Sequence, residues 1–319
     1  MGKDSGVNRS KCALITGISG FVGTHLSKTL AEGAWRVNGF DNNPPIFQVD
    51  DFYQGPLSDQ AVLGAAIHES RPDVIFHLAG VLKAEEIETF YTTHVLGTIN
   101  LFEAILEAGV KPLVIIASSS AVYGSGHGRH PITERSALRP LNHYAVSKAA
   151  QEMVARRYSL AHELLVTCIR TFNLLGPGLS MQMACSSFAK QIARAEQGQG
   201  NRIIETGNLG ARRDFVDVRD AVRAFKMIAE DGKAGVIYNI CSEHAVSIKK
   251  CLDTLIGMSN VDLKTEIDPR LAQENDASIQ VGSAKRLKQE TGWRPRISVK
   301  QSLTDLLNDW RLRIKSGRL

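Results

Sequence analysis

The stretch CALITGISGFVG, residues Cys12–Gly23, joins an apolar run to a glycine-rich turn. The run Cys12–Gly17 has the pattern of a buried β-strand, and Phe21–Glu32 has that of an amphipathic helix. Three glycines separate the two in a G-x-x-G-x-x-G spacing: Gly17, Gly20 and Gly23. Glycine permits positive φ in a tight turn and lets the helix pack closely on the strand. The stretch therefore predicts a strand, a sharp turn and a helix in immediate succession.

The same alternation of strand and helix continues through the first half of the chain. Four further apolar runs read as strands, at Trp35–Asp41, Asp73–Gly80, Leu113–Ser120 and Leu164–Arg170. Helical patterns lie between them at Ser58–Glu69, Glu86–Ala108 and Tyr144–Ala161. Strands that are apolar throughout are typical of parallel sheets covered on both faces. We therefore predict an α/β fold with a doubly wound parallel sheet of the Rossmann type.

The pattern becomes less regular beyond Asn173, which predicts a second part of the molecule. A helix is expected at Cys185–Gln197, and Val236–Ser242 reads as a strand that returns to the main sheet. We predict a Rossmann domain of residues 11–175 with about 214–244. A smaller, discontinuous lobe takes residues 176–213 and 245–311, and residues 1–10 form a disordered lead-in.

Composition excludes several classes of protein. The 319 residues carry a net charge of +5, are 43% hydrophobic and contain no apolar run near the roughly 18–20 residues that span a bilayer. The five cysteines form no C-x-x-C pair, which favours a reduced, cytoplasmic protein without a disulfide or metal framework. The basic residues are scattered, which favours a solvated surface over nucleic-acid binding. We predict no membrane, nucleic-acid or metal partner.

The glycine turn has the features of a phosphate-binding loop. The N-terminus of the helix after it presents free N–H groups and a partial positive charge. We expect a pyrophosphate to contact five residues there: Gly17, Gly20, Phe21, Val22 and Gly23. A purely structural turn is the alternative, but the position between the first strand and a helix favours binding.

Asp41 ends the second predicted strand, 18 residues beyond Gly23. A carboxylate at this position accepts hydrogen bonds from both hydroxyls of a ribose and repels a 2′-phosphate. Asn42 and Asn43 follow, with no arginine to hold such a phosphate. The residues predict a preference for NAD over NADP.

Tyr144 and Lys148 stand one helical turn apart in the stretch LNHYAVSK. Such a pair alone is often no more than two neighbours on a helix surface. Together with the glycine turn, Asp41 and the stretches HLAG (His77–Gly80) and SSSAVYG (Ser118–Gly124), it resembles an extended short-chain dehydrogenase/reductase of the NAD-dependent epimerase/dehydratase family. The likeness runs from about residue 11 to residue 311.

The resemblance implies a role for each matching residue. Tyr144 would exchange a proton with a sugar hydroxyl or carbonyl, while Lys148 and the positive nicotinamide ring would lower its pKa from the usual value near 10. Ser119 would donate a hydrogen bond to the same sugar oxygen. Further contacts with the dinucleotide are expected from Asn42, Leu57, Leu78, Ala79, Gly80 and Thr171, beside Asp41, Tyr144 and Lys148.

The C-terminal half is most similar to the GDP-6-deoxy-4-keto-mannose reductases and the GDP-mannose 4,6-dehydratases. The stretches that carry this likeness are IRTFNLLGPG (Ile169–Gly178), GNLGARRDFVDVRDAVRA (Gly207–Ala224), YNICS (Tyr238–Ser242), DPRL (Asp268–Leu271) and TGWRPRIS (Thr291–Ser298). It implies that a nucleotide-diphosphate sugar contacts Ser120, Asn173 and Arg213, because a planar guanidinium suits a phosphate. A surface ion pair of Arg213 with Asp214 or Asp217 is the alternative.

Several positions depart from the family pattern. Ser120 and Ala121 stand where dehydratases carry an acidic pair, so elimination lacks its base and acid. Pro56 replaces an aspartate that usually contacts adenine. Gln273 stands at about the position where the family usually has an arginine that contacts the diphosphate. His94 replaces a customary asparagine and either lies near the nicotinamide or packs inside its helix. His143 either touches substrate or caps the helix that follows.

These observations predict an NAD(P)-dependent enzyme that acts on a nucleotide sugar. The preferred hypothesis is reduction of the C4 ketone of a nucleotide-linked 4-keto-6-deoxy sugar. The alternatives are a nucleotide-sugar 4-epimerase that retains bound NAD and a non-catalytic dinucleotide-sensing protein. The resemblance also implies a homodimer, with the helices Glu86–Ala108 and Tyr144–Ala161 forming a four-helix bundle with a second subunit.

Overall fold

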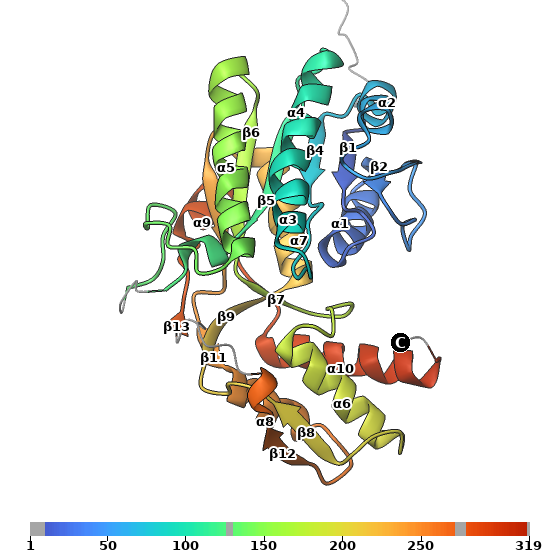
Figure 1. Ribbon diagram of the computed structural model, residues 1–319, viewed down its shortest axis with the longest axis vertical. Coiled ribbons are helices and arrows are strands. Elements are labelled where there is room, and N and C mark those ends of the chain that lie inside the picture. The colour runs from blue at the N-terminus through green and yellow to red at the C-terminus, as the bar shows by residue number, and fades with distance from the viewer. Residues whose placement is uncertain (1–9, 126–129, 272–278, 318–319) are drawn as a thin grey trace, which may run out of the picture. The chain divides into compact units, whose positions relative to one another are not determined.

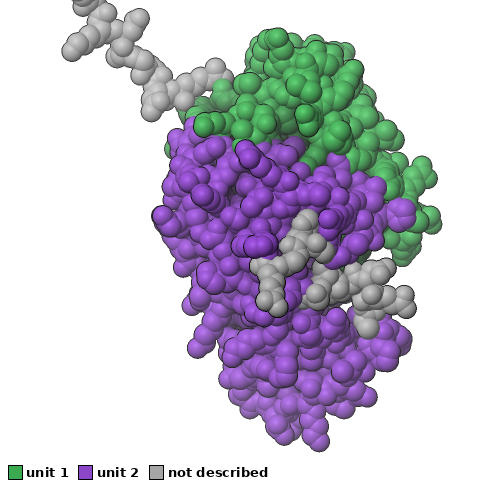
Figure 2. All heavy atoms as spheres, turned by 90° about the vertical axis from the view of Figure 1, so that its left-hand side faces the viewer, with its two compact units in different colours: residues 1–117, 150–167, 233–236 green, residues 118–149, 168–232, 237–319 purple. Residues whose placement is uncertain are grey.

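The computed structural model describes residues 10–125, 130–271 and 279–317. Most of the predicted disordered lead-in lies outside the described residues, and so does Gln273. The chain divides into two compact units, coloured in Figure 2. Unit 1 comprises residues 1–117, 150–167 and 233–236, and unit 2 comprises residues 118–149, 168–232 and 237–319. The predicted domain boundaries differ from this division and stay a prediction.

A parallel sheet of seven strands forms the core of the described chain, in the order β10-β6-β5-β4-β1-β2-β3 (Figure 1). Helices flank this sheet, so the predicted Rossmann-type α/β fold is confirmed. The bounds are β1 Cys12–Thr16, β2 Arg36–Asp41, β3 Asp51–Gln54, β4 Val74–His77, β5 Leu113–Ser119, β6 Val166–Thr171 and β10 Ile237–Ile240. Strand β10 pairs with β6, so the expected return of the chain to the main sheet is also confirmed.

The strand order reverses beside β1, which pairs with β2 on one side and with β4 on the other. Ligands of open parallel sheets bind at the carboxyl ends of the strands near such a reversal. All five residues of β1 are buried, as expected for a central strand. The sequence pattern did not predict β3, whose two middle residues are half-buried and whose two end residues are exposed.

Helices α1 (Phe21–Glu32) and α2 (Gln60–Ser70) pack on β1 and β2, and α4 (Gly97–Glu107) packs on α2. The single helix predicted for Glu86–Ala108 is corrected by the structure. A short α3 (Ile87–Tyr91) leads into a π-helix, η1 (Thr92–Leu96), before α4 begins. At this break the hydroxyl of Thr98 donates to the carbonyl oxygen of His94 at 2.6 Å. A side chain that enters the helical ladder in this way is a known cause of local deformation.

Helix α5 (His143–His162) is the longest described helix, and its residues fall in both units. The remaining elements belong to unit 2. A four-stranded sheet contains β7 (Asn173–Leu175), β9 (Arg212–Asp217), β11 (Ala245–Ser247) and β13 (Ile279–Gln280). A two-stranded sheet pairs β8 (Ile203–Thr206) with β12 (Lys264–Ile267). The helical elements are η2 (Ser120–Tyr123), α6 (Ala184–Glu196), α7 (Val218–Asp231), α8 (Ile248–Ile256), η3 (Pro269–Leu271), α9 (Lys285–Thr291) and α10 (Val299–Lys315).

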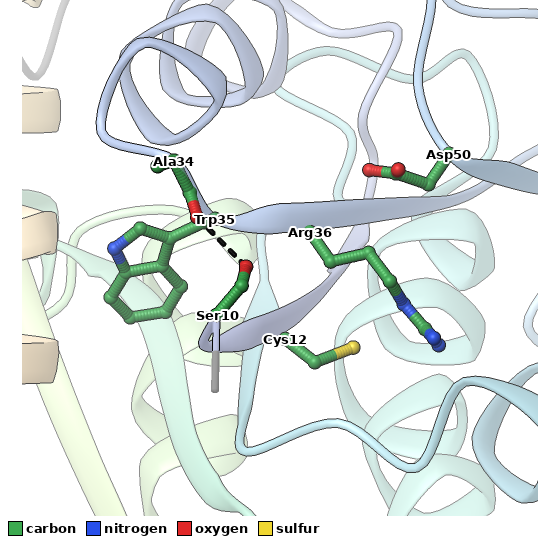
Figure 3. A pocket seen from close by; sticks show the side chains of 6 residues that line it. All are labelled: Ser10, Cys12, Ala34, Trp35, Arg36 and Asp50. Carbon is green, nitrogen blue, oxygen red and sulfur yellow. Dashed lines mark hydrogen bonds between the residues drawn. The ribbon is translucent and has the colours of Figure 1, made fainter. Parts of the chain in front are cut away.

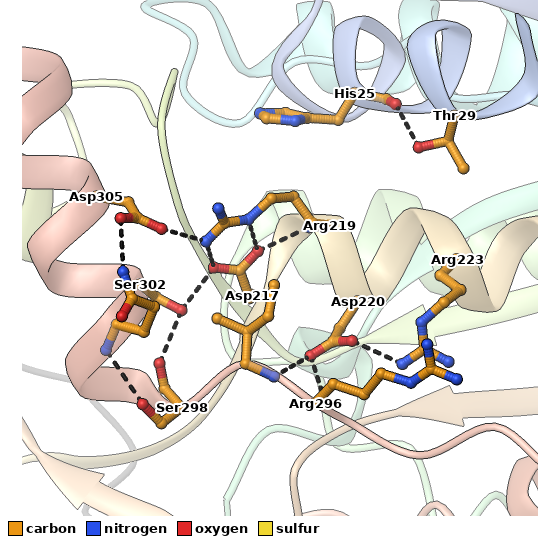
Figure 4. Close-up of polar contacts among 12 residues, drawn as sticks. His25, Thr29, Asp217, Arg219, Asp220, Arg223, Arg296, Ser298, Ser302 and Asp305 are labelled. Atoms are coloured by element: carbon orange, nitrogen blue, oxygen red, sulfur yellow. Dashed lines mark hydrogen bonds and ion pairs between the residues drawn. The ribbon is translucent and has the colours of Figure 1, made fainter. Parts of the chain in front are cut away.

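A buried carboxylate connects α10 to the start of α7 (Figure 4). Asp217 accepts two hydrogen bonds from the side chain of Arg219 at 2.8 Å and one from Ser302 at 2.6 Å. Burial raises the pKa of Asp217, but these donors outweigh it and hold the pKa below its usual value. The same arginine pairs with Asp305 on α10 at 2.6 Å. The cluster therefore holds the C-terminal helix in place within unit 2.

Candidate active site

Only glycine fits the first and third glycine positions of the turn. Gly17 has φ of +75°, and a Cβ there would come 2.6 Å from the backbone nitrogen of Ala79. A Cβ on Gly23 would come 2.2 Å from the carbonyl oxygen of Gly17. Helix α1 begins directly after the turn, and no side chain caps its N-terminus. The N-cap residue Gly20 has no side chain to accept from the first N–H groups of the helix, which therefore suit a phosphate.

The carboxylate of Asp41 lies against this turn. One oxygen accepts a hydrogen bond from the backbone nitrogen of Ser19 at 3.0 Å, and the other accepts from Asn43 at 3.3 Å. The hydroxyl of Ser19 donates in turn to the carbonyl oxygen of Asn43 at 2.5 Å. Asp41 is half-buried and Asn42 is exposed. The structure thus brings the predicted ribose-binding carboxylate to the predicted phosphate loop.

The segment that follows β4 forms the other side of the glycine turn. It contains Leu78, Ala79 and Gly80, and Ala79 is the residue against which Gly17 packs. The backbone nitrogen of Val81 donates to Nε2 of His94 at 3.1 Å. Because a backbone N–H can only donate, this ring nitrogen carries no proton. His94 lies in η1 and is completely buried. This burial agrees with the prediction that His94 packs inside its helix, and its distance from a nicotinamide stays untested.

Two other predicted positions of unit 1 have defined surroundings. Leu57 is buried, and its carbonyl oxygen accepts from the side chain of Asn100 at 2.9 Å. Pro56, which precedes it, is exposed. Leu57 therefore fixes the loop after β3 to α4, whereas Pro56 offers no N–H to a ligand.

Ser119 and Tyr144 meet in unit 2, where their side chains share a hydrogen bond. Ser119 ends β5, and its Oγ accepts from the backbone nitrogen of Ala121 at 3.1 Å. Since that bond uses the oxygen as an acceptor, the hydroxyl proton is available to donate toward Tyr144. Lys148 lies one turn beyond Tyr144 on α5, on the same face of the helix, and is buried. The three predicted catalytic residues thus belong to one small region.

Burial is the main influence on the pKa of Tyr144. The ring is half-buried by accessible area, yet protein surrounds it densely, and this burial raises the pKa above its usual value. The hydrogen bond from Ser119 acts in the opposite direction, because it stabilises the phenolate. The resemblance implies a lowered pKa, and positive charge near the hydroxyl, of the kind that an oxidised nicotinamide ring carries, would act in that direction.

The start of α5 is capped by a neighbour of His143. The side-chain oxygen of Asn142 accepts from the backbone nitrogen of Ala145 at 2.9 Å, which is an N-cap hydrogen bond. His143 itself is exposed. The capping role that the sequence offered to His143 is therefore filled by Asn142.

The predicted substrate residues lie on adjacent strands of unit 2. Asn173 begins β7, which runs parallel to β9, and its side chain donates to the carbonyl oxygen of Asp214 at 3.4 Å. Arg213 on β9 is half-buried and donates to the carbonyl oxygen of Arg212 at 3.1 Å. Thr171 ends β6, shortly before β7. The structure therefore places Asn173 and Arg213 on paired strands, and Thr171 stands two residues before Asn173 in the sequence.

Ser120 has a different environment from the one expected. Its side chain is buried, and its hydroxyl lies 3.4 Å from the side-chain oxygen of Gln280. Nε2 of Gln280 donates to the carbonyl oxygen of Ser120 at 2.9 Å. The observed partner of Ser120 is thus a protein amide, and its contact with substrate stays a prediction.

The sequence did not predict the role of two buried residues that organise this region. Asp214 accepts four hydrogen bonds from three residues, Ser242, Glu243 and Gly282, at 2.7–3.1 Å. Gln280 joins β13 to the end of β5, across 160 positions of sequence. Asp214 stands in a stretch that attracted attention only through its arginines. No pattern in a single sequence connects Gln280 to Ser120.

The pocket in Figure 3 lies at the opposite edge of the sheet from the glycine turn. Its volume is about 470 Å³, and its lining comes from the starts of β1, β2 and β3 and the residues just before them: Ser10, Cys12, Ala34, Trp35, Arg36 and Asp50. The hydroxyl of Ser10 donates there to the carbonyl oxygen of Ala34 at 2.8 Å. Within the described residues no cluster of metal-binding side chains is found, and no helix has the length and apolarity to cross a membrane.

A family model described as the NAD dependent epimerase/dehydratase family matches residues 13–241. The chain belongs to this family. It is accordingly an NAD(P)-dependent enzyme of the short-chain dehydrogenase/reductase superfamily. The GDP-6-deoxy-D-mannose reductase of Pseudomonas aeruginosa is 33% identical over 94% of this chain and 97% of its own length.

Two solved structures of the family extend the comparison. The structure of RMD from Pseudomonas aeruginosa complexed with NADPH has a TM-score of 0.85 and 32% identity, covering 95% of this chain and all of its own. The structure of MoeE5 in complex with UDP-glucuronic acid and NAD has a TM-score of 0.83 and 27% identity, with 95% and 99% coverage. Both relatives thus match almost the whole length of the chain.

Proposed function

We propose that this protein reduces the C4 ketone of a nucleotide-linked 4-keto-6-deoxy sugar, with GDP-4-keto-6-deoxy-mannose as the first substrate to test. The hydrogen-bonded pair of Ser119 and Tyr144, with Lys148 one turn further along α5, carries this proposal. Likeness to the reductase of Pseudomonas aeruginosa supports the substrate class. The reaction needs a general acid and a second hydrogen-bond donor at the same carbonyl oxygen, and Tyr144 and Ser119 supply them.

When bound, the reduced dinucleotide supplies the hydride that goes to C4 of the sugar. Tyr144 then gives its hydroxyl proton to the ketone oxygen, which becomes the new alcohol. Ser119 donates a hydrogen bond to the same oxygen and holds it beside Tyr144. Lys148 stabilises the phenolate that remains, because its ammonium lies on the same helix face. Arg213 and Asn173 hold the diphosphate of the substrate.

The residues at the end of β5 oppose a dehydratase reaction. Loss of water from C5 and C6 of the sugar needs a base and an acid near Ser119. Ser120 and Ala121 follow Ser119, and the buried hydroxyl of Ser120 faces Gln280. The chain therefore offers proton transfer at C4 without an acidic pair for elimination.

The glycine turn and Asp41 fit the pyrophosphate and the adenosine ribose of a dinucleotide. Apart from Tyr144 and Lys148, twelve residues are proposed to contact it: Gly17, Gly20, Phe21, Val22, Gly23, Asp41, Asn42, Leu57, Leu78, Ala79, Gly80 and Thr171. We propose NAD as the preferred form, because the carboxylate of Asp41 lies at the turn and repels a 2′-phosphate. The relative complexed with NADPH makes a direct comparison of the two forms necessary.

A 4-epimerase is the second candidate function. The same three catalytic residues would oxidise C4 and return the hydride to the other face of the sugar. Asp41 favours this candidate, since an epimerase regenerates a bound NAD in each turnover. The dinucleotide content of the purified, denatured protein separates the two: stoichiometric NAD supports the epimerase, and an empty protein supports the reductase.

The decisive assay follows absorbance at 340 nm with GDP-4-keto-6-deoxy-mannose and either NADH or NADPH. Consumption of the reduced dinucleotide with formation of a 6-deoxy sugar supports the reductase. No consumption, together with interconversion of C4 epimers of a nucleotide sugar, would replace it by the epimerase. Faster turnover with NADPH than with NADH would contradict the proposed role of Asp41.

We also propose that the protein is a cytoplasmic homodimer. Three apolar side chains stand seven residues apart on α5 and are exposed, Val146 by 38%, Met153 by 62% and Leu160 by 74%. This spacing forms one stripe along a helix, which suits burial against a second copy. All five cysteines are buried and unpaired by disulfides, as suits a reducing compartment. Light scattering that gives the monomer mass at micromolar concentration would contradict the dimer.

A further inference from the structure

The peptide group between Ser120 and Ala121 has hydrogen bonds on both of its sides. Its N–H, on Ala121, donates to Oγ of Ser119 at 3.1 Å. Its carbonyl oxygen, on Ser120, accepts from Nε2 of Gln280 at 2.9 Å. One rigid, planar unit therefore connects the amide of Gln280 to the hydroxyl of Ser119.

The orientation of the Gln280 amide follows from chemistry. The carbonyl oxygen of Ser120 can only accept, so the NH2 group of Gln280 must face it. The oxygen of that amide then lies 3.4 Å from the hydroxyl of Ser120. Gln280 is 7% exposed, so water does not compete freely for these groups. Ser120 is also the first residue of the 3-10 helix η2, whose i→i+3 pattern uses the same carbonyl oxygen as an acceptor. Loss of the amide would remove the side-chain hydrogen bond to this buried carbonyl and so loosen the hold on the peptide plane.

The position of Gln280 is itself fixed by neighbouring strands. It lies on β13, in register with Arg213 on β9. Two residues further on, the backbone nitrogen of Gly282 donates to the buried carboxylate of Asp214 at 3.1 Å. Strand β9, which carries the proposed diphosphate-binding residue Arg213, therefore also holds in place the strand that carries Gln280.

We propose that Gln280 is a positioning residue for the reaction, which acts on Ser119 through the Ser120–Ala121 peptide group. By fixing this group, Gln280 keeps the N–H of Ala121 directed at Oγ of Ser119. The serine oxygen is then occupied as an acceptor, and its proton is directed toward Tyr144 and the sugar oxygen. The inference rests on the proposed function, because it takes Ser119 as the donor to that oxygen.

The test is a double-mutant cycle of Gln280→Leu with Ser119→Ala, measured with GDP-4-keto-6-deoxy-mannose and NADH. Gln280→Leu alone should lower kcat by about 10–100-fold while the Kd for NADH stays within about twofold. In the Ser119→Ala background the same change should cost no more than about twofold, because its target is already absent. Equal losses in both backgrounds would overturn the inference.

Gln280→Glu tests the hydrogen-bond donor of this side chain separately from its size. A carboxylate has almost the size of the amide but cannot donate to the carbonyl oxygen of Ser120, so it should lower kcat as Gln280→Leu does. Gln191→Leu is the matched control. Gln191 also joins a side-chain amide to backbone groups, those of Glu205 at 2.8 and 3.2 Å, but it does so between α6 and β8. This variant should keep the wild-type kcat.

A second readout does not depend on turnover. The amide proton resonance of Ala121 should move upfield in Ser119→Ala, in Gln280→Leu and in Gln280→Glu, and should stay in place in Gln191→Leu. An unchanged resonance in both Gln280 variants would refute the inference. If the wild-type protein consumes no NADH with this sugar, or if Ser119→Ala retains full turnover, the proposed function fails. The resonance of Ala121 still decides the role of Gln280 in that case.

Discussion

Close contacts between backbone atoms determine the shape of the glycine turn, whereas side-chain hydrogen bonds determine the arrangement around Ser119. Gly17 and Gly23 leave space that any Cβ would fill, and all the residues of the turn lie within seven positions of sequence. The serine region joins Ser119, Tyr144 and Gln280, which come from β5, α5 and β13. A turn of the first kind is damaged by adding atoms, and a site of the second kind is damaged by removing them.

The two regions also differ in how they meet charge. The turn presents N–H groups of the uncapped α1 to an anion, and this property belongs to the helix itself. At Tyr144, in contrast, burial raises the pKa of the hydroxyl, and the hydrogen bond from Ser119 opposes that shift. The turn therefore offers partial positive charge from its backbone, whereas at Tyr144 burial and the hydrogen bond from Ser119 act on the pKa in opposite directions.

The largest effect is expected from Tyr144→Phe. This change keeps the ring and removes the hydroxyl, so kcat should fall by about 10²–10⁴-fold while the Kd for the dinucleotide stays nearly constant. Steady-state kinetics and equilibrium titration measure the two quantities separately. A kcat within a few-fold of wild type would remove Tyr144 from the proposed mechanism.

Asp214→Asn should destabilise unit 2 by about 2 kcal/mol or more. The amide places a donor at one of the two oxygens that now accept, so either the N–H of Ser242 or those of Glu243 and Gly282 lose their partner. Urea denaturation gives the free energy of unfolding, and kcat should fall because β13 carries Gln280. Wild-type stability together with wild-type kcat would show that the four hydrogen bonds do not hold the region.

Gly23→Ala should act on the backbone region alone. The added Cβ would lie 2.2 Å from the carbonyl oxygen of Gly17, which should cost about 1–3 kcal/mol of stability and weaken binding of the dinucleotide. Gly64→Ala is the control. A Cβ at Gly64, inside α2, has no atom within 4 Å, so this variant should be as stable as wild type or slightly more so. Equal thermal stability of the two variants would contradict the close packing of the turn.

The smallest effect concerns the titration of Tyr144 in the absence of dinucleotide. Burial raises its pKa above 10.0, so the phenolate should appear only at higher pH. Because the folded pKa exceeds the unfolded one, the stability that Tyr144 contributes is complete below about pH 10 and is lost as the pH rises through the folded pKa. Absorbance at 295 nm, wild type minus Tyr144→Phe, measures the midpoint. A midpoint below 10 without any ligand would contradict the effect of burial.

The local parts of the molecule were predictable from the sequence. Helix α1 has the predicted bounds, and β1, β2 and β5 end within one or two residues of the expected positions. These elements follow from apolar runs and glycines that are adjacent in sequence. The π-helix around His94 was not predictable, because it depends on how Thr98 and Val81 bond to one residue after folding.

The candidate site was predictable to a similar degree. Ser119, Tyr144 and Lys148 were identified because their motifs match a family, and not because their spacing shows that they meet. Gln280 and Asp214 were missed, because their importance comes from partners that are distant in sequence. A single sequence carries no record of such pairs.

The hydrogen bond between Ser120 and Gln280 also has a consequence for the synthesis of the protein. It spans 160 residues, so the partner of Ser120 leaves the ribosome long after the glycine turn and α5 have done so. Chains begin to fold from the N-terminus as they emerge. The predicted dinucleotide loop can therefore form early, while Ser120, next to the proposed catalytic Ser119, obtains its partner only when the chain is nearly complete. With the roles proposed above, an unfinished chain would be able to bind the dinucleotide before it is able to react.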